Sequence, residues 1–240
     1  MTQFPVDWKQ DRLKDVCLVN PAVLPAATDP DFEFPYLESS NVDYFGIIDV
    51  FAIERMRFED APSRARRVVF TNCTIISSVR PNLQAVAFFP CDPNGLICST
   101  GFNVVRPDEH KLWPKFLYYV LISDYARQLF EATATGVGYP AVADKYFGVF
   151  VLPLPGLTEQ KLVATYLNAS CNLIDTVASL YKTSDDVRGS KGVLNRQIEA
   201  LFLYRKALIH ECVTGQRRIT EADVQQAGAQ RRFDNPCPKG

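Results

Sequence analysis

What the sequence lacks restricts its chemistry first. Only two of its 240 residues are histidines, His110 and His210, and they lie in different regions of the chain. The sequence contains no Gly-x-Ser-x-Gly motif, no Gly-x-x-x-x-Gly-Lys-Ser/Thr phosphate loop and no His-Glu-x-x-His motif. A glycine-rich cofactor loop is absent as well. We therefore expect no catalytic residue, no metal site and no cofactor bound by this chain.

Long apolar runs and a regular cysteine pattern are also missing. No apolar stretch approaches the roughly 20 residues of a membrane span, and the start, MTQFPVDWKQDRLKDV, carries charges where a secretion signal has an apolar core. The seven cysteines are scattered without any Cys-x-x-Cys pair, which favours buried reduced thiols over a disulfide framework. These features predict a cytoplasmic protein that does not enter a membrane.

The charge is nearly balanced but unevenly distributed. Residues 1–150 carry 14 Lys+Arg against 18 Asp+Glu, a net charge of −4, and residues 151–240 carry 12 against 9, a net charge of +3. A general electrostatic nucleic-acid binder is usually more basic than the overall net charge of −1. With 47% hydrophobic and 22% charged residues, the composition is that of a globular protein.

The first region, residues 1–155, has the pattern of a mixed, β-rich domain. β-Branched and apolar residues predict one or two strands over 67–79, another over 83–89, and a strand or a pair of strands over 96–107. The cluster Pro90–Gly95 between them contains Asn-Gly, a strong turn signal. Apolar residues at helical spacing predict a helix over 112–134.

The second region, residues 156–216, has the pattern of a long coiled-coil helix. From Tyr166 to Cys212, fourteen positions keep a 4-3 spacing and ten of them are apolar. Since such a seam needs a partner helix, we expect it to form a dimer or subunit interface. The residues expected there are Leu173, Val177, Leu180, Val187, Leu194, Ile198, Leu201 and Leu208.

Gly189 and Gly192 lie inside this seam. Each glycine costs about 1 kcal/mol relative to alanine in a helix interior, but the spacing does not slip across them, which favours one continuous helix. A helical hairpin that folds at Gly189–Gly192 is the alternative. Residues 217–240 form a polar tail that we expect to be disordered. The predicted fold class is therefore α+β, with a β-rich domain followed by a long helical segment.

Six segments carry a resemblance to a known family. Together with Trp8, which precedes the first of them, they span residues 8–216, about nine-tenths of the chain. They are RLKDVCLVN (12–20), TIISSVRPNLQAVAF (74–88), STGFNVVRP (99–107), TGVGYPAV (135–142), PLPGLTEQKLVATYLNASCNLID (153–175) and LYRKALIHECVTGQ (203–216). In this order they resemble the specificity (S) subunit of type I restriction–modification enzymes.

This resemblance implies a target recognition domain that reads double-stranded DNA, followed by a long helix that sets spacing and docks methylation subunits. Methylation, with S-adenosylmethionine, would belong to the methylation subunit, and cleavage to a restriction subunit where one occurs. Family members usually carry two recognition domains and two such helices, whereas this sequence has one of each. It therefore resembles a half subunit, which implies that two copies pair through the helices. A homodimer would read an interrupted palindrome, and pairing with a different half subunit is the alternative.

Candidate DNA contacts combine this resemblance with the chemistry of the residues. In TGVGYPAV, Gly136 and Gly138 allow backbone N–H groups to approach phosphates, and Tyr139 offers a ring and a hydroxyl. A tight structural turn is the alternative for this loop. Arginine can form paired hydrogen bonds with guanine, and asparagine or glutamine can do so with adenine. For the cluster Arg64, Arg66 and Arg67, a solvated strand edge is the alternative. The further candidates are Arg64, Arg66, Arg67, Arg80, Asn82, Gln84 and Lys145.

Two other classes of function remain as alternatives. A coiled-coil scaffold whose globular domain binds protein would keep sequence-specific methylation after mutation of Arg66 or Arg80. A stand-alone enzyme would bind S-adenosylmethionine in the isolated chain, which the missing cofactor loop disfavours.

Overall fold

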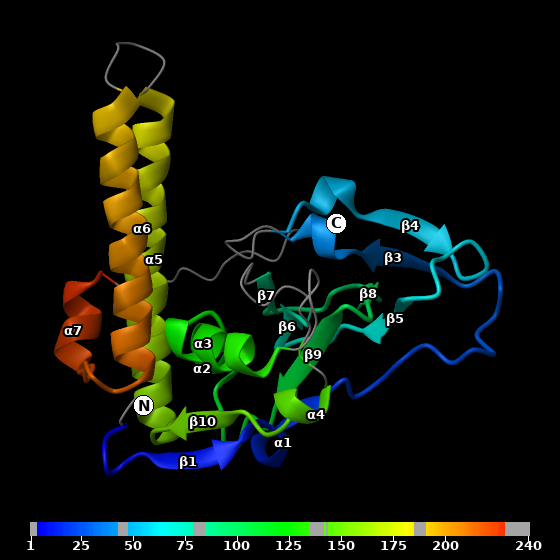
Figure 1. The fold of residues 1–240 in the computed structure, drawn as a ribbon, viewed down its shortest axis with the longest axis horizontal. Coiled ribbons are helices and arrows are strands. Elements are labelled where there is room, and N and C mark those ends of the chain that lie inside the picture. Colours follow the sequence, from blue (N-terminus) through cyan, green and yellow to red (C-terminus); the bar gives the residue numbers. More distant parts are fainter. Residues whose placement is uncertain are drawn as a thin grey trace.

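The computed structural model describes residues 4–42, 48–78, 85–134, 142, 144–184 and 191–228. Within these ranges only the backbone is described at residues 39, 50, 144, 145, 181–184 and 191–194. Two long helices, α5 and α6, stand side by side at one end of the molecule, and the larger sheets lie at the other (Figure 1). The helices α2 and α3 lie between them. This arrangement confirms the predicted α+β class.

One four-stranded antiparallel sheet has the order β2-β9-β6-β7. Its central strands are rich in β-branched residues, and Ile75 lies opposite both Val104 and Ala87. All three side chains are buried. The strands are β2 (Cys17–Val19), β6 (Cys73–Ser77), β7 (Val86–Phe89) and β9 (Phe102–Pro107).

A second four-stranded sheet has the order β4-β3-β8-β5. The pairing of β3 with β8 is parallel, and the two outer pairings are antiparallel. The register shifts between Ala65 and Arg67, where β5 pairs with β8. The elements are β3 (Glu33–Leu37), β4 (Glu54–Arg57), β5 (Ala65–Val68), β8 (Ile97–Ser99) and the short 3-10 helices η1 (Ser39–Asn41) and η2 (Val50–Ala52).

The strand predictions are confirmed in outline. Residues 67–79 contribute to β5 and β6, and residues 96–107 form the pair β8 and β9. The predicted segment 83–89 contains β7, although residues 79–84 lie outside the described part of the chain. The expected turn also forms, since Asn94 and Gly95 both have positive φ angles, 52° and 75°.

The N-terminus returns to the end of the first region in a small two-stranded sheet. Strand β1 (Lys9–Arg12) pairs antiparallel with β10 (Val151–Leu154), so residues far apart in sequence lie side by side. The short helices α1 (Leu13–Val16) and α4 (Asp144–Phe147) flank this sheet (Figure 1).

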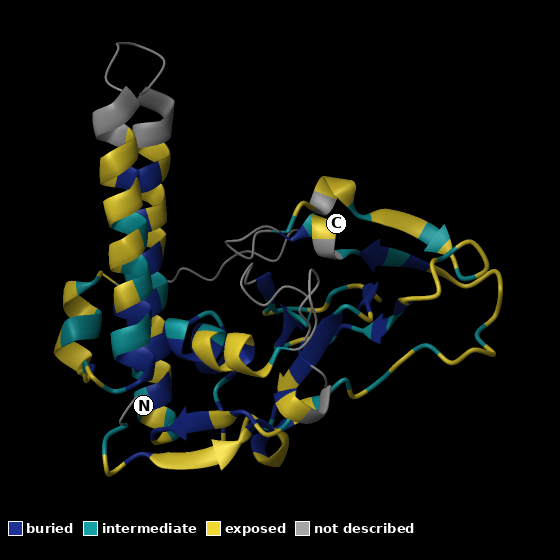
Figure 2. Cartoon of the chain, in the orientation of Figure 1, coloured by how far each residue is buried: buried dark blue, intermediate teal, exposed yellow. Residues whose placement is uncertain are grey.

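Two apolar clusters hold these layers together. In one, Leu37 and Cys98 of the second sheet meet Ile75 and Val104 of the first, so the two sheets pack on each other. The larger cluster joins the first sheet to the helices, with buried residues from β7, β9, α2, α5 and α6. Figure 2 shows buried residues concentrated in the sheets and where α2 meets α5 and α6. The first sheet therefore has an apolar core on each face, one shared with the second sheet and one shared with the helices.

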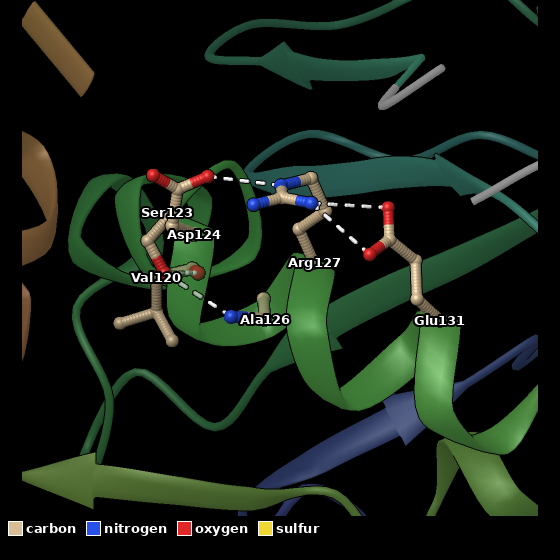
Figure 3. Close-up of polar contacts among 6 residues, drawn as sticks. All are labelled: Val120, Ser123, Asp124, Ala126, Arg127 and Glu131. Atoms are coloured by element: carbon tan, nitrogen blue, oxygen red, sulfur yellow. Dashed lines mark hydrogen bonds and ion pairs between the residues drawn. The ribbon is translucent and has the colours of Figure 1, made fainter. Parts of the chain in front are cut away.

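The helix expected over 112–134 is two helices, α2 (Pro114–Leu121) and α3 (Asp124–Thr133). Ser123 caps α3, accepting a hydrogen bond from the backbone N–H of Ala126 (3.4 Å) and donating one to the carbonyl oxygen of Val120 (2.6 Å; Figure 3). Because a serine hydroxyl satisfies free backbone groups at a helix start, the chain turns at this position.

The favoured single helix over 156–216 is wrong, and the hairpin alternative holds, although Gly192 lies within α6 and Gly189 is outside the described residues. Helix α5 (Leu157–Ser184) and helix α6 (Lys191–Val213) pack against each other, and Arg205 Nε lies 3.3 Å from Asp175 Oδ1. In a continuous helix these two residues would be about 45 Å apart. The reversal occurs because the apolar faces of both helices find partners within the chain. No helix in the described ranges is long and apolar enough to cross a membrane.

The prediction of a disordered tail is wrong for residues 217–228. Helix α7 (Glu221–Gln226) starts with a capping box between Thr220 and Asp223, and Ile219 is buried. Arg218 pairs with Asp7 at 3.0 Å, and this contact ties the C-terminal segment to the N-terminus. Local capping and apolar anchoring thus order a polar stretch; residues 229–240 lie outside the described residues.

Five cysteines fit the expectation of buried reduced thiols. They are free and buried, and burial raises the pKa of each thiol. Cys91 is disulfide-bonded, so the expectation does not hold for that residue. The free thiols are Cys17, Cys73, Cys98, Cys171 and Cys212.

Candidate nucleic-acid interface

A chain of backbone hydrogen bonds gathers three of the predicted DNA-contact segments at one place. The carbonyl oxygen of Arg64 accepts from Thr100 N (2.8 Å), and the carbonyl oxygen of Gly101 accepts from Ser78 N (2.8 Å). The carbonyl oxygen of Ser78 accepts in turn from Val142 N (2.9 Å). Hence the turn between β8 and β9 joins the start of β5 to the residues that flank segments 79–84 and 135–141.

Side-chain and backbone contacts reinforce this convergence. Ser78 Oγ donates a second hydrogen bond to the carbonyl oxygen of Gly101 (2.9 Å). On the other flank of segment 79–84, Ala85 accepts from Ser77 N at 2.9 Å, which continues the pairing of β6 with β7. Both ends of this segment are therefore anchored on the first sheet.

Six of the predicted DNA contacts lie outside the described residues. Only their flanking residues are placed, at the convergence point formed by Arg64, the Thr100–Gly101 turn, Ser78 and Val142. Lys145 belongs to α4, close behind Val142 in the chain, but its side chain is not described. The six are Arg80, Asn82, Gln84, Gly136, Gly138 and Tyr139.

Arg64 is exposed at the convergence point. Its side chain is 58% exposed and forms an ion pair with Glu38, whose carboxylate raises the pKa of the guanidinium. An ion pair this exposed contributes only about 0–1 kcal/mol. A phosphate could therefore replace Glu38 as the partner of Arg64 at little cost.

Arg66 is half-buried against an aromatic ring. Its guanidinium lies 4.4 Å from the ring centroid of Phe58 and donates to the carbonyl oxygen of Ala65 (2.9 Å). The ring contact holds the guanidinium against the second sheet.

Arg67 is buried, and the prediction that it contacts DNA is wrong for this structure. Only 9% of the residue is exposed, and its guanidinium donates to Asn103 Oδ1 (2.9 Å) and to the carbonyl oxygen of Phe102. The register shift between Ala65 and Arg67 puts Arg67 opposite Cys98, whose side chain lies in the apolar cluster between the two sheets. Its charge therefore serves the contact between the two sheets.

The partner of Arg67 belongs to a polar network that the sequence analysis missed. Asn20 Nδ2 donates to Asn103 Oδ1 (2.9 Å), and Asn20 Oδ1 accepts from Val104 N (2.9 Å). Asn103 is completely buried within a strand whose neighbours are apolar. A polar residue inside the apolar pattern FNVV was the sequence signal that could have revealed it.

The predicted interface residues of the long helices divide into two groups. Leu173 and Leu180 are 64% and 63% exposed, whereas Ile198 and Leu208 are buried within the chain. Since α6 folds back on α5, the prediction that Ile198 and Leu208 contact another subunit is wrong. Val177 and Leu201 are half-buried; Val187 and the side chain of Leu194 lie outside the described part.

In the described ranges, no group of three or more histidine, cysteine, aspartate or glutamate residues could hold a metal ion. The titratable groups with large pKa shifts are thiols, tyrosines and Lys115, all shifted mainly by burial. The described part of the interface therefore consists of an exposed arginine and backbone groups at strand ends, which can contact a ligand such as a phosphate.

Two packed sheets thus present anchored segments at one end and are joined to a helical hairpin. The family model for the type I restriction modification DNA specificity domain matches residues 5–182, about three quarters of the chain. This chain belongs to that family.

Two curated relatives are specificity subunits. The type I restriction enzyme MjaX specificity subunit of Methanocaldococcus jannaschii is 23% identical over 216 residues, which cover 88% of this chain and 47% of that protein. The type I restriction enzyme HindI specificity subunit of Haemophilus influenzae is 23% identical over 165 residues, covering 65% and 34%. This chain thus spans between a third and a half of the length of these relatives.

Solved structures show the same fold. The HsdS subunit from Thermoanaerobacter tengcongensis matches with a TM-score of 0.66 and 32% identity, over 77% of this chain and 47% of that one. A chain from a study of complex assembly and conformational transition of the type I R-M system matches with a TM-score of 0.68 and 31% identity, over the same shares.

Proposed function

We propose that this chain is the DNA sequence-recognition part of a type I restriction–modification enzyme and reads one half of a bipartite target. The observation that carries the proposal is the convergence of Arg64, the flanks of 79–84 and the flank of 135–141 on one turn. Membership of the DNA specificity family supports it.

The residues at this end suit DNA in two ways. Arg64 is exposed and positively charged, so it can contact a phosphate. Arg80, Asn82 and Gln84 follow an anchored strand end, and their side chains can pair with guanine or adenine edges. Gly136, Gly138 and Tyr139 can supply backbone and ring contacts from the neighbouring segment.

Methylation would come from a partner methylation subunit that binds S-adenosylmethionine, and cleavage from a restriction subunit where one occurs. The net charge of −4 over residues 1–150 supports this division, because phosphate neutralisation supplies much of the affinity for DNA. We expect the isolated chain to bind DNA weakly at physiological salt. Tight binding without a partner subunit would contradict this expectation.

A second copy of this chain is the proposed partner for the hairpin. Leu173 and Leu180 are seven residues apart on α5, so they lie on one face, and both are exposed. Two such faces related by a two-fold axis would bury each other and hold two recognition domains at a fixed distance. The target would then be an interrupted palindrome.

The decisive experiment maps methylated adenines in the source genome with and without this gene. We expect one interrupted motif to disappear on deletion, to return with the wild-type gene, and to return more weakly with Arg64→Ala. An unchanged methylome, in cells that express this chain and its methylation subunit, would refute the proposal. It would favour the scaffold alternative, in which the globular domain binds protein.

A further inference from the structure

One buried amide joins three segments of the chain where the recognition sheets meet the helical hairpin. Gln160 lies in the first turn of α5 and is only 1% exposed. Its Oε1 accepts a hydrogen bond from Trp113 N (2.7 Å), and its Nε2 donates to the carbonyl oxygens of Lys111 (3.0 Å) and Pro155 (2.9 Å). Both N–H groups and the oxygen of the amide are thus bonded to backbone groups.

The three segments belong to different parts of the molecule. Lys111 and Trp113 lead into α2, which packs against β6, β7 and β9 of the first sheet. Pro155 follows β10, and Gln160 itself belongs to the hairpin. Lys161, the next residue, places its Nζ 4.7 Å from the centre of the Trp113 ring. Gln160 therefore connects the hairpin directly to the start of α2.

Helix α2 transmits this connection to the sheets. It contacts both α5 and α6, and Figure 1 shows it between the hairpin and the strands. Lys115 Nζ lies 4.8 Å from the ring centre of Phe88, which belongs to β7, and the ring centres of Tyr118 and Phe88 are 5.9 Å apart. A helix held by Gln160 at its start and by these ring contacts along its side has little freedom to rotate against the sheet.

We propose that Gln160 is a positioning residue that fixes the angle between the hairpin and the recognition sheets, and thereby the spacing at which two half-sites are read. This inference rests on the proposed function. One added base pair moves a half-site by about 3.4 Å and rotates it by about 35°. Only a rigid connection between the recognition domain and the hairpin would prevent the protein from binding half-sites whose spacing differs by one base pair.

The chemistry of the amide explains why glutamine stands here. Methionine matches its length but makes none of the three hydrogen bonds. Glutamate keeps the acceptor for Trp113 N but loses both donors and turns a carboxylate toward two carbonyl oxygens. Both variants keep the helix propensity of α5, so they loosen the joint without breaking the helix.

The test uses cells that lack the gene and carry wild type, Gln160→Met, Gln160→Glu or the matched control Gln225→Met, since Gln225 is exposed on α7. Methylation is mapped at every genomic pair of half-sites with the native spacer and with spacers one base pair shorter or longer. We expect the ratio of native to altered spacers to fall at least tenfold in both Gln160 variants and to stay unchanged in the control.

A uniform loss of methylation with an unchanged spacer ratio would overturn the inference, because it would show that Gln160 only stabilises the fold. If Gln160→Met does not accumulate in cells, the test rests on Gln160→Glu, which keeps one hydrogen bond. The ratio of methylation at native spacers to methylation at altered spacers is then compared between Gln160→Glu and wild type. Failure of the proposed function looks different, since wild type would then produce no interrupted motif.

Discussion

Replacing Arg67 with methionine removes a buried guanidinium that sequence alone assigns to the DNA surface. In the structure it donates to Asn103 Oδ1 and to the carbonyl oxygen of Phe102, while Asn20 donates to the same Asn103 oxygen. After the change, Asn103 Oδ1 keeps one donor from Asn20. The Phe102 oxygen loses the donor that Arg67 provides.

The expected loss of unfolding free energy is about 1–3 kcal/mol. A buried carbonyl oxygen left without a donor costs about that much, and methionine fills most of the volume of the arginine stem. For a domain of this size, each kcal/mol lowers the midpoint of thermal unfolding by about 2–4 °C. A loss of about 2 kcal/mol in unfolding free energy should therefore lower the thermal midpoint by roughly 4–8 °C.

The assay compares Arg67→Met with Arg64→Met by urea and thermal unfolding and by methylation in cells. Arg64 is exposed and its ion pair with Glu38 lies at the surface, so its replacement should change stability by less than about 1 kcal/mol. We expect Arg64→Met to weaken methylation without loss of stability. Arg67→Met should lower stability, and any loss of methylation should follow the amount of folded protein.

The opposite pattern would refute this reasoning. If Arg67→Met is as stable as wild type but abolishes methylation of the motif, the guanidinium acts at DNA and not between the sheets.

Three further predictions follow from the packing. Burial raises the pKa of Cys98 to about 12, so the stability from its neutral thiol is complete below the unfolded pKa of about 8.5 and falls by about 2 kcal/mol at pH 10. Under reducing conditions, the free energy of urea unfolding should therefore fall less between pH 7 and pH 10 in Cys98→Ala than in wild type. An equal fall in both proteins would contradict the burial of this thiol. Ser123→Ala removes the cap of α3 shown in Figure 3 and should cost about 1 kcal/mol in thermal unfolding. The double change Leu173→Glu and Leu180→Glu should leave stability nearly unchanged because both side chains are exposed, but should lower the mass in sedimentation from two chains to one; an unchanged mass would exclude this face as the dimer contact.

Local chemistry made the strands and turns predictable. The β-branched run around Ile75 and the Asn94–Gly95 turn depend on backbone preferences of the residues themselves. The α+β class followed from these segments together with the helical spacing after Pro155. The break at Ser123 was missed, because a serine in an apolar helical pattern caps a new helix only when tertiary packing turns the chain there.

The sequence by itself determined helix over residues 166–184 and 191–212, but not which side chains of the 4-3 spacing are covered, or by which helix. Apolar burial is not directional, so the same 4-3 spacing is satisfied by a second copy or by the chain folding back. Only the tertiary structure placed Leu208 inside and left Leu173 outside. The same holds for Arg64 and Arg67, which are alike in sequence. The register shift of β5 against β8 places Arg67 opposite Cys98 on the face that meets the first sheet, whereas Arg64 precedes the strand and is exposed.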